Sequence, residues 1–76
     1  MAAHHRNQWT STKAEDRARA EAKDMADFDF RMGTIAQEKT LWRMAESHVD
    51  RFKTAPWIRG LWARTYQARI AELREP

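Results

Sequence analysis

Pro56 is the sharpest structural boundary in this chain. Proline disfavours helical geometry in the residue before it, here Ala55, and is itself favoured in the first turn of a helix. The 76 residues contain only one other proline, at the last position, and two glycines. With so few interruptions, the pattern predicts a helix that ends near Lys53 and another that spans about 56–74.

A first helix is predicted over about 12–32. Thr12 followed three residues later by Glu15 is the pattern of a capping box, and good helix formers continue to Met32. At about 100° per residue, one face of this helix is apolar and the opposite face is charged. The apolar face begins with small alanines, Ala18 and Ala22, which suit the close approach of a neighbouring helix, whereas Phe30 points away from it.

The second helix is predicted over about 34–53. Gly33 is a typical helix stop, and Thr34 with Gln37 forms a second capping-box pattern. A single glycine costs a helix only about 1 kcal/mol relative to alanine, so a continuous helix from Lys13 to Phe52 stays open as the alternative.

The predicted fold class is therefore all-α, a small three-helix bundle formed by a helical hairpin and a third helix. We expect one helical domain over 12–76, preceded by a mobile arm over 1–11. The expected core takes its residues from all three helices: Met25, Phe28, Met32, Leu41, Ala45, Val49, Phe52, Ile58, Trp62, Ile70 and Leu73.

The third helix has two apolar stripes instead of one. Ile58, Trp62, Tyr66, Ile70 and Leu73 form the stronger stripe, and Trp57, Leu61, Ala68 and Ala71 lie nearly opposite, with Arg64 among them. One stripe suffices for an intramolecular core. The second implies a helix packed between neighbours, the contact of a two-fold homodimer, or a surface for another partner.

Positive charge is concentrated in the same region. The net charge of +3 is modest, and residues 1–33 are neutral apart from histidines. Between Asp50 and Glu72 there is no acidic residue and a local charge of +5, from Arg51, Lys53, Arg59, Arg64 and Arg69. A run of this kind is often only a solvated helix face, but interleaved with Trp and Tyr it also suits phosphate and base contacts.

The sequence lacks the groups that most enzymes use. It has no cysteine, its two glycines cannot form a phosphate loop, and Ser47 next to His48 on a helix does not face it. His48 itself lies at the margin of an apolar face, where a structural role is common. The pair His4 and His5 has no third ligand at a suitable spacing. We expect no catalysis, no cofactor and no metal.

No stretch is apolar enough for a membrane span, and no secretory signal pattern opens the sequence, so a cytoplasmic location is expected. A basic amphipathic helix that binds a membrane surface is disfavoured, because the arginines are spread around the third helix.

The expected function is that of a small regulator, inhibitor or adaptor that binds a larger protein. Trp, Tyr and Arg are enriched at the energetic centres of protein interfaces. The expected contact residues are Trp57, Leu61 and Arg64, with Trp9 from the arm. The alternative is binding to DNA or RNA through the basic aromatic segment 51–69, with Arg51, Lys53, Arg59, Arg64 and Arg69 as the phosphate contacts.

Overall fold

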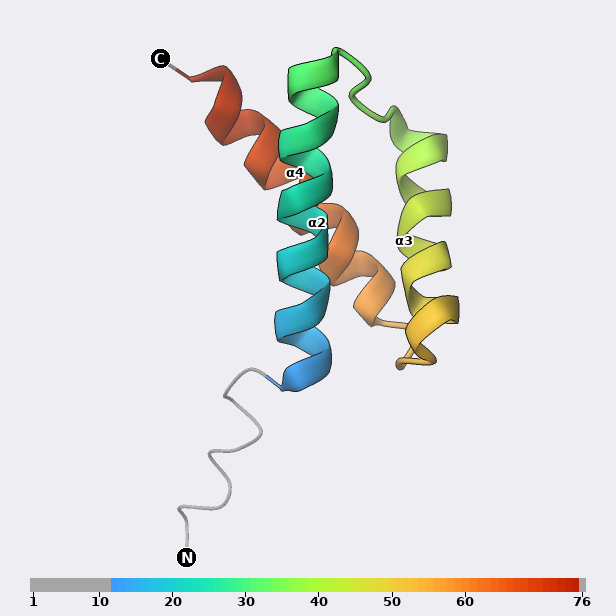
Figure 1. Ribbon diagram of the computed structural model, residues 1–76. Helices are drawn as coiled ribbons and strands as arrows, with labels where there is room; N and C mark the ends of the chain where they lie inside the picture. The colour runs from blue at the N-terminus through green and yellow to red at the C-terminus, as the bar shows by residue number, and fades with distance from the viewer. Residues whose placement is uncertain (1–11, 76) are drawn as a thin grey trace, which may run out of the picture.

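The computed structural model describes residues 12–75, so Trp9 and the arm over 1–11 lie outside the described residues. Three helices make up the fold: α2 (Lys13–Met32), α3 (Glu38–Phe52) and α4 (Ile58–Arg74). In Figure 1, α2 and α3 run antiparallel, and α4 crosses α2 obliquely. The described chain contains no β-strand. The protein is thus an all-α three-helix bundle, as predicted.

The start and the end of α2 follow the sequence signals closely. The Thr12 hydroxyl accepts a hydrogen bond of 3.1 Å from the Glu15 N–H, and the Glu15 carboxylate accepts one of 3.0 Å from the Thr12 N–H. Gly33 ends the helix in the left-handed region, with φ 73°. The next residue donates its N–H back to the Asp29 carbonyl at 2.8 Å. The continuous helix considered as the alternative is therefore wrong.

The predicted capping box at Thr34 and Gln37 does not form. Residues 34–37 form no helix and α3 starts at Glu38; Gln37 has an extended backbone and makes no capping bond with its side chain. The turn at Gly33 brings the Thr34 hydroxyl back to α2, where it donates to Asp29 Oδ1 at 3.3 Å. The second helix consequently begins four residues later than predicted.

The connection from α3 to α4 is a tight turn. Lys53 adopts a left-handed conformation, with φ 52°, immediately after the last residue of α3. Pro56 and Trp57 form a turn in which the N–H groups of residues 58–60 bond to carbonyls three residues earlier, each at 3.1 Å. The third helix therefore starts at Ile58, two residues after the predicted position, because Pro56 initiates this turn and not the α-helix itself.

The core lies where α4 meets α2 and α3. Ala18, Ala22 and Ala26 of α2 are fully buried, so the predicted close approach at the first two is confirmed. The rings of Trp62 and Tyr66 stack with their centroids 5.7 Å apart. The other buried apolar residues are Leu41, Ala45, Ile58, Ala63 and Ile70.

The predicted core is wrong at three residues, which are exposed. Phe28, Met32 and Phe52 are 48%, 60% and 38% exposed. The small alanines let the backbone of α2 lie close to α4. With the alanine face turned toward α4, the bulky Phe28 and Met32 lie at the margin of the interface. Phe52 instead lies under the guanidinium of Arg17, which is 4.2 Å from its ring centre. Three more of the predicted set are only half-buried: Met25, Val49 and Leu73.

Candidate partner-binding surface on α4

The second apolar stripe of α4 faces away from the core. We call the outer stripe the five residues Trp57, Leu61, Arg64, Ala68 and Ala71. Trp57 is 57% exposed, and Arg64, Ala68 and Ala71 are also exposed. Leu61 is half-buried and packs against the edge of the core. Apart from Leu61, the residues of this stripe are exposed in the described chain. Three of the four predicted partner-binding residues share this face, and the fourth, Trp9, is not described.

The opposite face of α4 is held by a carboxylate on α2. Glu21 Oε1 accepts a hydrogen bond of 2.9 Å from the indole Nε1 of Trp62 and another from His48 Nδ1. Arg51 adds two bonds to the same carboxylate, at 3.0 and 3.2 Å. Burial alone would raise the pKa of Glu21, but the hydrogen bonds from Arg51, His48 and Trp62 outweigh it and lower the pKa to about 2. One acidic side chain thus joins all three helices.

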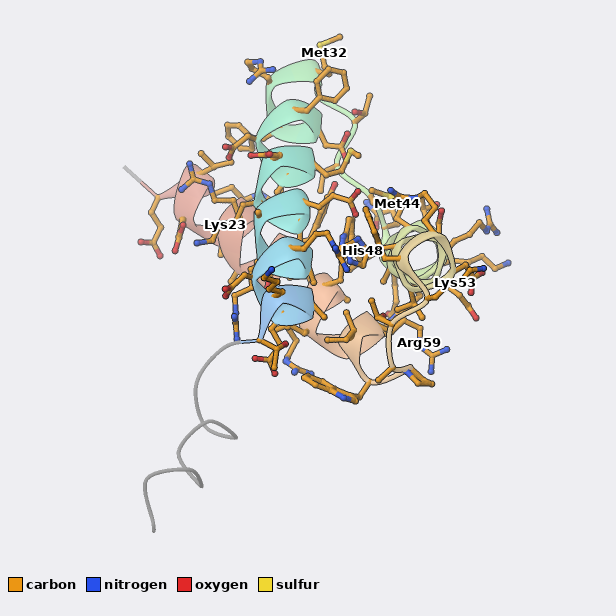
Figure 2. The ribbon with its side chains drawn as sticks, turned by 60° about the horizontal axis from the view of Figure 1, so that its bottom comes forward. Lys23, Met32, Met44, His48, Lys53 and Arg59 are labelled. Carbon is orange, nitrogen blue, oxygen red and sulfur yellow. The ribbon has the colours of Figure 1, made fainter. Side chains whose placement is uncertain are left out.

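His48 is part of this structural cluster and is more deeply buried than predicted. Figure 2 shows it pointing from α3 toward α2. Its ring is fully buried, 4.8 Å from the Phe52 ring and 6.5 Å from the Trp62 ring. Its Nε2 finds no hydrogen-bond partner among residues 12–75. Ser47 is exposed, so the adjacent serine and histidine share no surface.

A second polar contact holds the middle of α4. The Tyr66 hydroxyl donates to Asp29 Oδ2 at 2.5 Å and accepts a hydrogen bond from the Ala36 N–H at 2.9 Å. Burial, the bond to Asp29 and its charge raise the pKa of Tyr66 to about 12. Asp29 is only 8% exposed. Through Ala36, this contact ties the segment 34–37 to α4.

Three of the five basic residues predicted to contact nucleic acid form ion pairs with carboxylates on other helices. Arg51 pairs with Glu21, and Arg59 with Glu46 at 3.5 Å. Arg69 binds Asp27 at 2.7 Å and Glu72 at 3.0 Å. The structure shows no ion pair for Lys53 or Arg64 in the described chain. The five residues of the alternative nucleic-acid site therefore do not form one free basic face.

Arg64 lies along the outer side of α4. A Cβ atom placed on Gly60 would come within 3.1 Å of one guanidinium nitrogen of Arg64. Because Gly60, one helical turn earlier, has no side chain, the guanidinium of Arg64 can occupy the space beside it. The guanidinium of Arg64 therefore lies beside the backbone of Gly60 on the outer side of α4.

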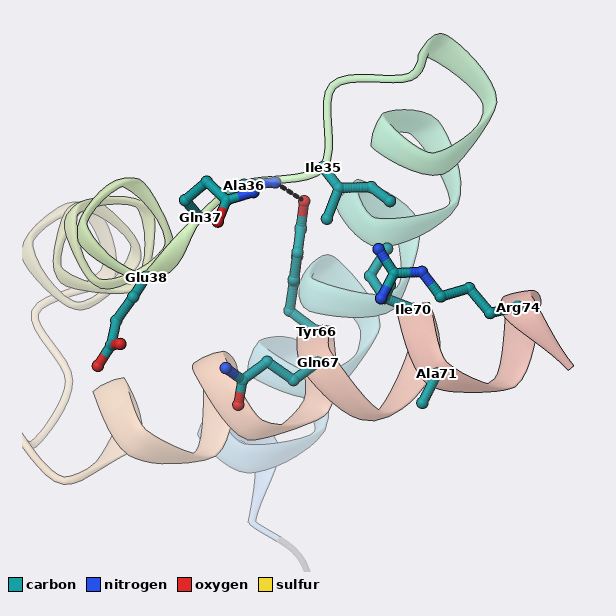
Figure 3. Close-up of a pocket in the computed structure, with 9 residues that line it drawn as sticks. All are labelled: Ile35, Ala36, Gln37, Glu38, Tyr66, Gln67, Ile70, Ala71 and Arg74. Atoms are coloured by element: carbon teal, nitrogen blue, oxygen red, sulfur yellow. Dashed lines mark hydrogen bonds between the residues drawn. The ribbon is translucent and has the colours of Figure 1, made fainter.

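A shallow pocket adjoins the end of the outer stripe. It has a volume of about 320 Å³ and lies between α4 and the segment that leads into α3. Figure 3 shows Tyr66 pointing from α4 toward Ala36, and Arg74 extending back along α4 over Ile70. Residues of opposite charge border the pocket, and its lining includes Gln37, Glu38, Gln67, Ala71 and Arg74.

Two further classes of site are absent from residues 12–75. No three His, Asp or Glu side chains there lie close enough to hold a metal ion. None of the described helices combines the length and the apolar content needed to cross a bilayer.

Sequence reasoning missed Glu21 and Asp29, the two residues that organise the cluster. Both lie on the α2 face that carries Ala18 and Ala22, and an acid on such a face is a usable signal of a buried polar contact. Comparison of the chain with protein-family models, with curated proteins and with solved structures finds no match. The function is therefore inferred from the chain's own residues.

Proposed function

We propose that this protein is a non-enzymatic regulator, inhibitor or adaptor that binds a larger protein through the outer stripe of α4. The observation that carries the proposal is the 57% exposure of Trp57 in the turn that leads into α4, on the same side as Leu61 and Arg64. A tryptophan buries a large apolar area on binding and has few rotatable bonds to immobilise. Anchors of this type commonly cost about 2 kcal/mol or more of binding free energy when truncated to alanine.

Binding to nucleic acid is the second candidate, and the acid-free stretch from Arg51 to Ala71 favours it. The ion pairs of Arg51, Arg59 and Arg69 weaken it, because those guanidinium groups would have to leave their carboxylates to meet phosphates. With Lys53 and Arg64 as the free cations of this set, the logarithm of affinity should fall with the logarithm of salt concentration with a slope of only about −2.

The two candidates are separated by one pair of measurements. The full chain is tested for retention on duplex DNA, single-stranded DNA and RNA at about 50 and 200 mM salt. The same chain and its Trp57→Ala variant are used to recover proteins from lysate of the source cells. Phe30→Ala is the matched control, because Phe30 is an exposed aromatic residue on α2, 37% accessible.

We expect specific proteins to be recovered by the wild type and by Phe30→Ala, and to be lost with Trp57→Ala. Salt should have a small effect on their recovery. Salt-sensitive retention on nucleic acid that is indifferent to Trp57 would overturn the proposal and support the alternative.

A further inference from the structure

The spacing of the outer stripe is that of a helix-packing seam. Trp57, Leu61, Arg64, Ala68 and Ala71 are separated by four, three, four and three residues. This alternation is the heptad pattern that keeps one side of a helix against a partner helix over several turns. The small exposed side chains of Ala68 and Ala71 allow the two backbones to approach closely in the second half of the stripe.

The electrostatics of this seam indicate the charge of its partner. No Asp or Glu occurs from Arg51 to Ala71, and Arg64 occupies the centre of the stripe. Arg64 has no ion pair within the described residues, in contrast to Arg59 and Arg69. An arginine at the centre of an apolar seam loses water when a partner covers it, so the partner must supply a carboxylate at that point.

A second copy of this chain does not meet that requirement. A two-fold axis through the centre of the stripe places Arg64 against Arg64 of the second copy, in both the parallel and the antiparallel arrangement. Two guanidinium groups in contact at a desolvated seam repel each other, and no acid on the stripe compensates them. The charge at Arg64 therefore disfavours a dimer whose two-fold axis lies at this residue.

Resting on the proposed function, we propose that the outer stripe binds an acidic amphipathic helix of a protein partner. This helix carries apolar residues at heptad spacing and an Asp or Glu opposite Arg64. Its apolar residues pack against Trp57 and Leu61, and its carboxylate binds the guanidinium. Lys53, also without an ion pair in the described chain, adds attraction for acids near the α3–α4 turn.

The test uses a library of peptides displayed on a helical scaffold, with the outward positions of about three heptads randomised. The full chain is the bait, and the most enriched peptide is then measured by calorimetry. Trp57→Ala and Arg64→Glu are the test variants; both side chains are exposed, so the fold should persist. Arg43→Glu, at an exposed arginine of α3, is the charge control.

We expect enrichment of an acid flanked by apolar residues at heptad spacing. Arg64→Glu should weaken binding about tenfold or more, and Arg43→Glu should leave it within about twofold. Replacing the central acid of the peptide by lysine should restore binding to Arg64→Glu. That exchange of charges would locate the carboxylate opposite residue 64.

Other outcomes overturn the proposal in distinguishable ways. Peptides that need Trp57 but carry neutral or basic residues at the centre would contradict the acidic partner and leave the docking surface intact. If no peptide depends on Trp57, the proposed function fails as well. A wild-type dimer at about 100 µM that Trp57→Ala dissociates would show that a second copy covers this face. Nucleic-acid binding that depends on Arg64 alone would show the wrong class of partner.

Discussion

The indole Nε1 of Trp62 donates a hydrogen bond of 2.9 Å to Oε1 of Glu21, a residue 41 positions earlier in the chain. The same oxygen also binds His48 Nδ1. A carboxylate on α2 thereby fixes the central ring of α4 and the buried ring of α3. The outer stripe lies on the opposite side of the helix that this contact holds in place.

Glu21→Ala should therefore destabilise the protein by about 2–4 kcal/mol. The substitution leaves the buried donors of Trp62 and His48 without an acceptor and removes the partner of Arg51. Urea denaturation followed by circular dichroism measures the change. Asp24→Ala, on the exposed side of the same helix, is the control and should change stability by less than about 0.5 kcal/mol. Equal stability of the two variants would refute the role given to Glu21.

Stability should fall in acid through the same carboxylate. The pKa of Glu21 is about 2 in the folded protein, against an ordinary value of 4.5. Between these values the unfolded chain binds a proton at Glu21 that the folded protein does not. The contribution of Glu21 to stability is therefore fully present above pH 4.5 and is lost as the pH falls toward 2. The stability difference between wild type and Glu21→Gln, measured by urea denaturation, should shrink over this interval. A difference independent of pH would contradict the assigned pKa.

The alkaline side reports on the second polar contact. Tyr66 is the only tyrosine, so its ionisation can be followed directly by ultraviolet absorbance. We expect a midpoint at about 12 in the folded protein, because burial and the bond to Asp29 favour the neutral phenol. Since the folded pKa lies above the ordinary value of 10, the contribution of Tyr66 is present below pH 10 and is lost as the pH rises toward 12. An ordinary midpoint in the folded state would show that the contact with Asp29 does not form.

The helices and the bundle could be predicted from the sequence because their signals are local. The Thr12 capping box, the Gly33 stop and the turn at Pro56 all depend on residues a few positions apart. The face that α2 buries could not be predicted in the same way. Phe28 and Met32 carry more hydrophobicity than Ala18 or Ala22, and only the packing against α4 shows that close approach outweighs the bulk of the larger residues.

The candidate site was predicted in part for a similar reason. That Trp57, Leu61 and Arg64 share one face follows from helical periodicity alone. The neutralisation of Arg51 and Arg69 does not, because their partners Glu21 and Asp27 lie 30 and 42 residues away. A run of positive charge in a sequence cannot reveal pairing of this kind, since it depends on the tertiary arrangement.

Lys53 offers a test of the α3–α4 turn. A non-glycine residue in the left-handed region costs about 1 kcal/mol, so Lys53→Gly should increase stability by about 0.5–1 kcal/mol. Gly33→Ala is the reciprocal control and should decrease it by about 1 kcal/mol, because Gly33 has the same kind of backbone conformation. Thermal unfolding measures both variants. A loss of stability in Lys53→Gly would mean that the turn does not have this geometry in solution.

We have proposed that a protein partner covers the outer stripe at Trp57, with Arg64 at its centre. Photocrosslinking in the source cells can capture this partner, with a photoreactive phenylalanine analogue at position 57 and, as the control, at position 30. We expect a protein adduct at position 57 that disappears with Arg64→Glu, persists with Arg43→Glu and does not form from position 30. A nucleic-acid adduct at position 57, or the same protein adducts from both positions irrespective of Arg64, would contradict it.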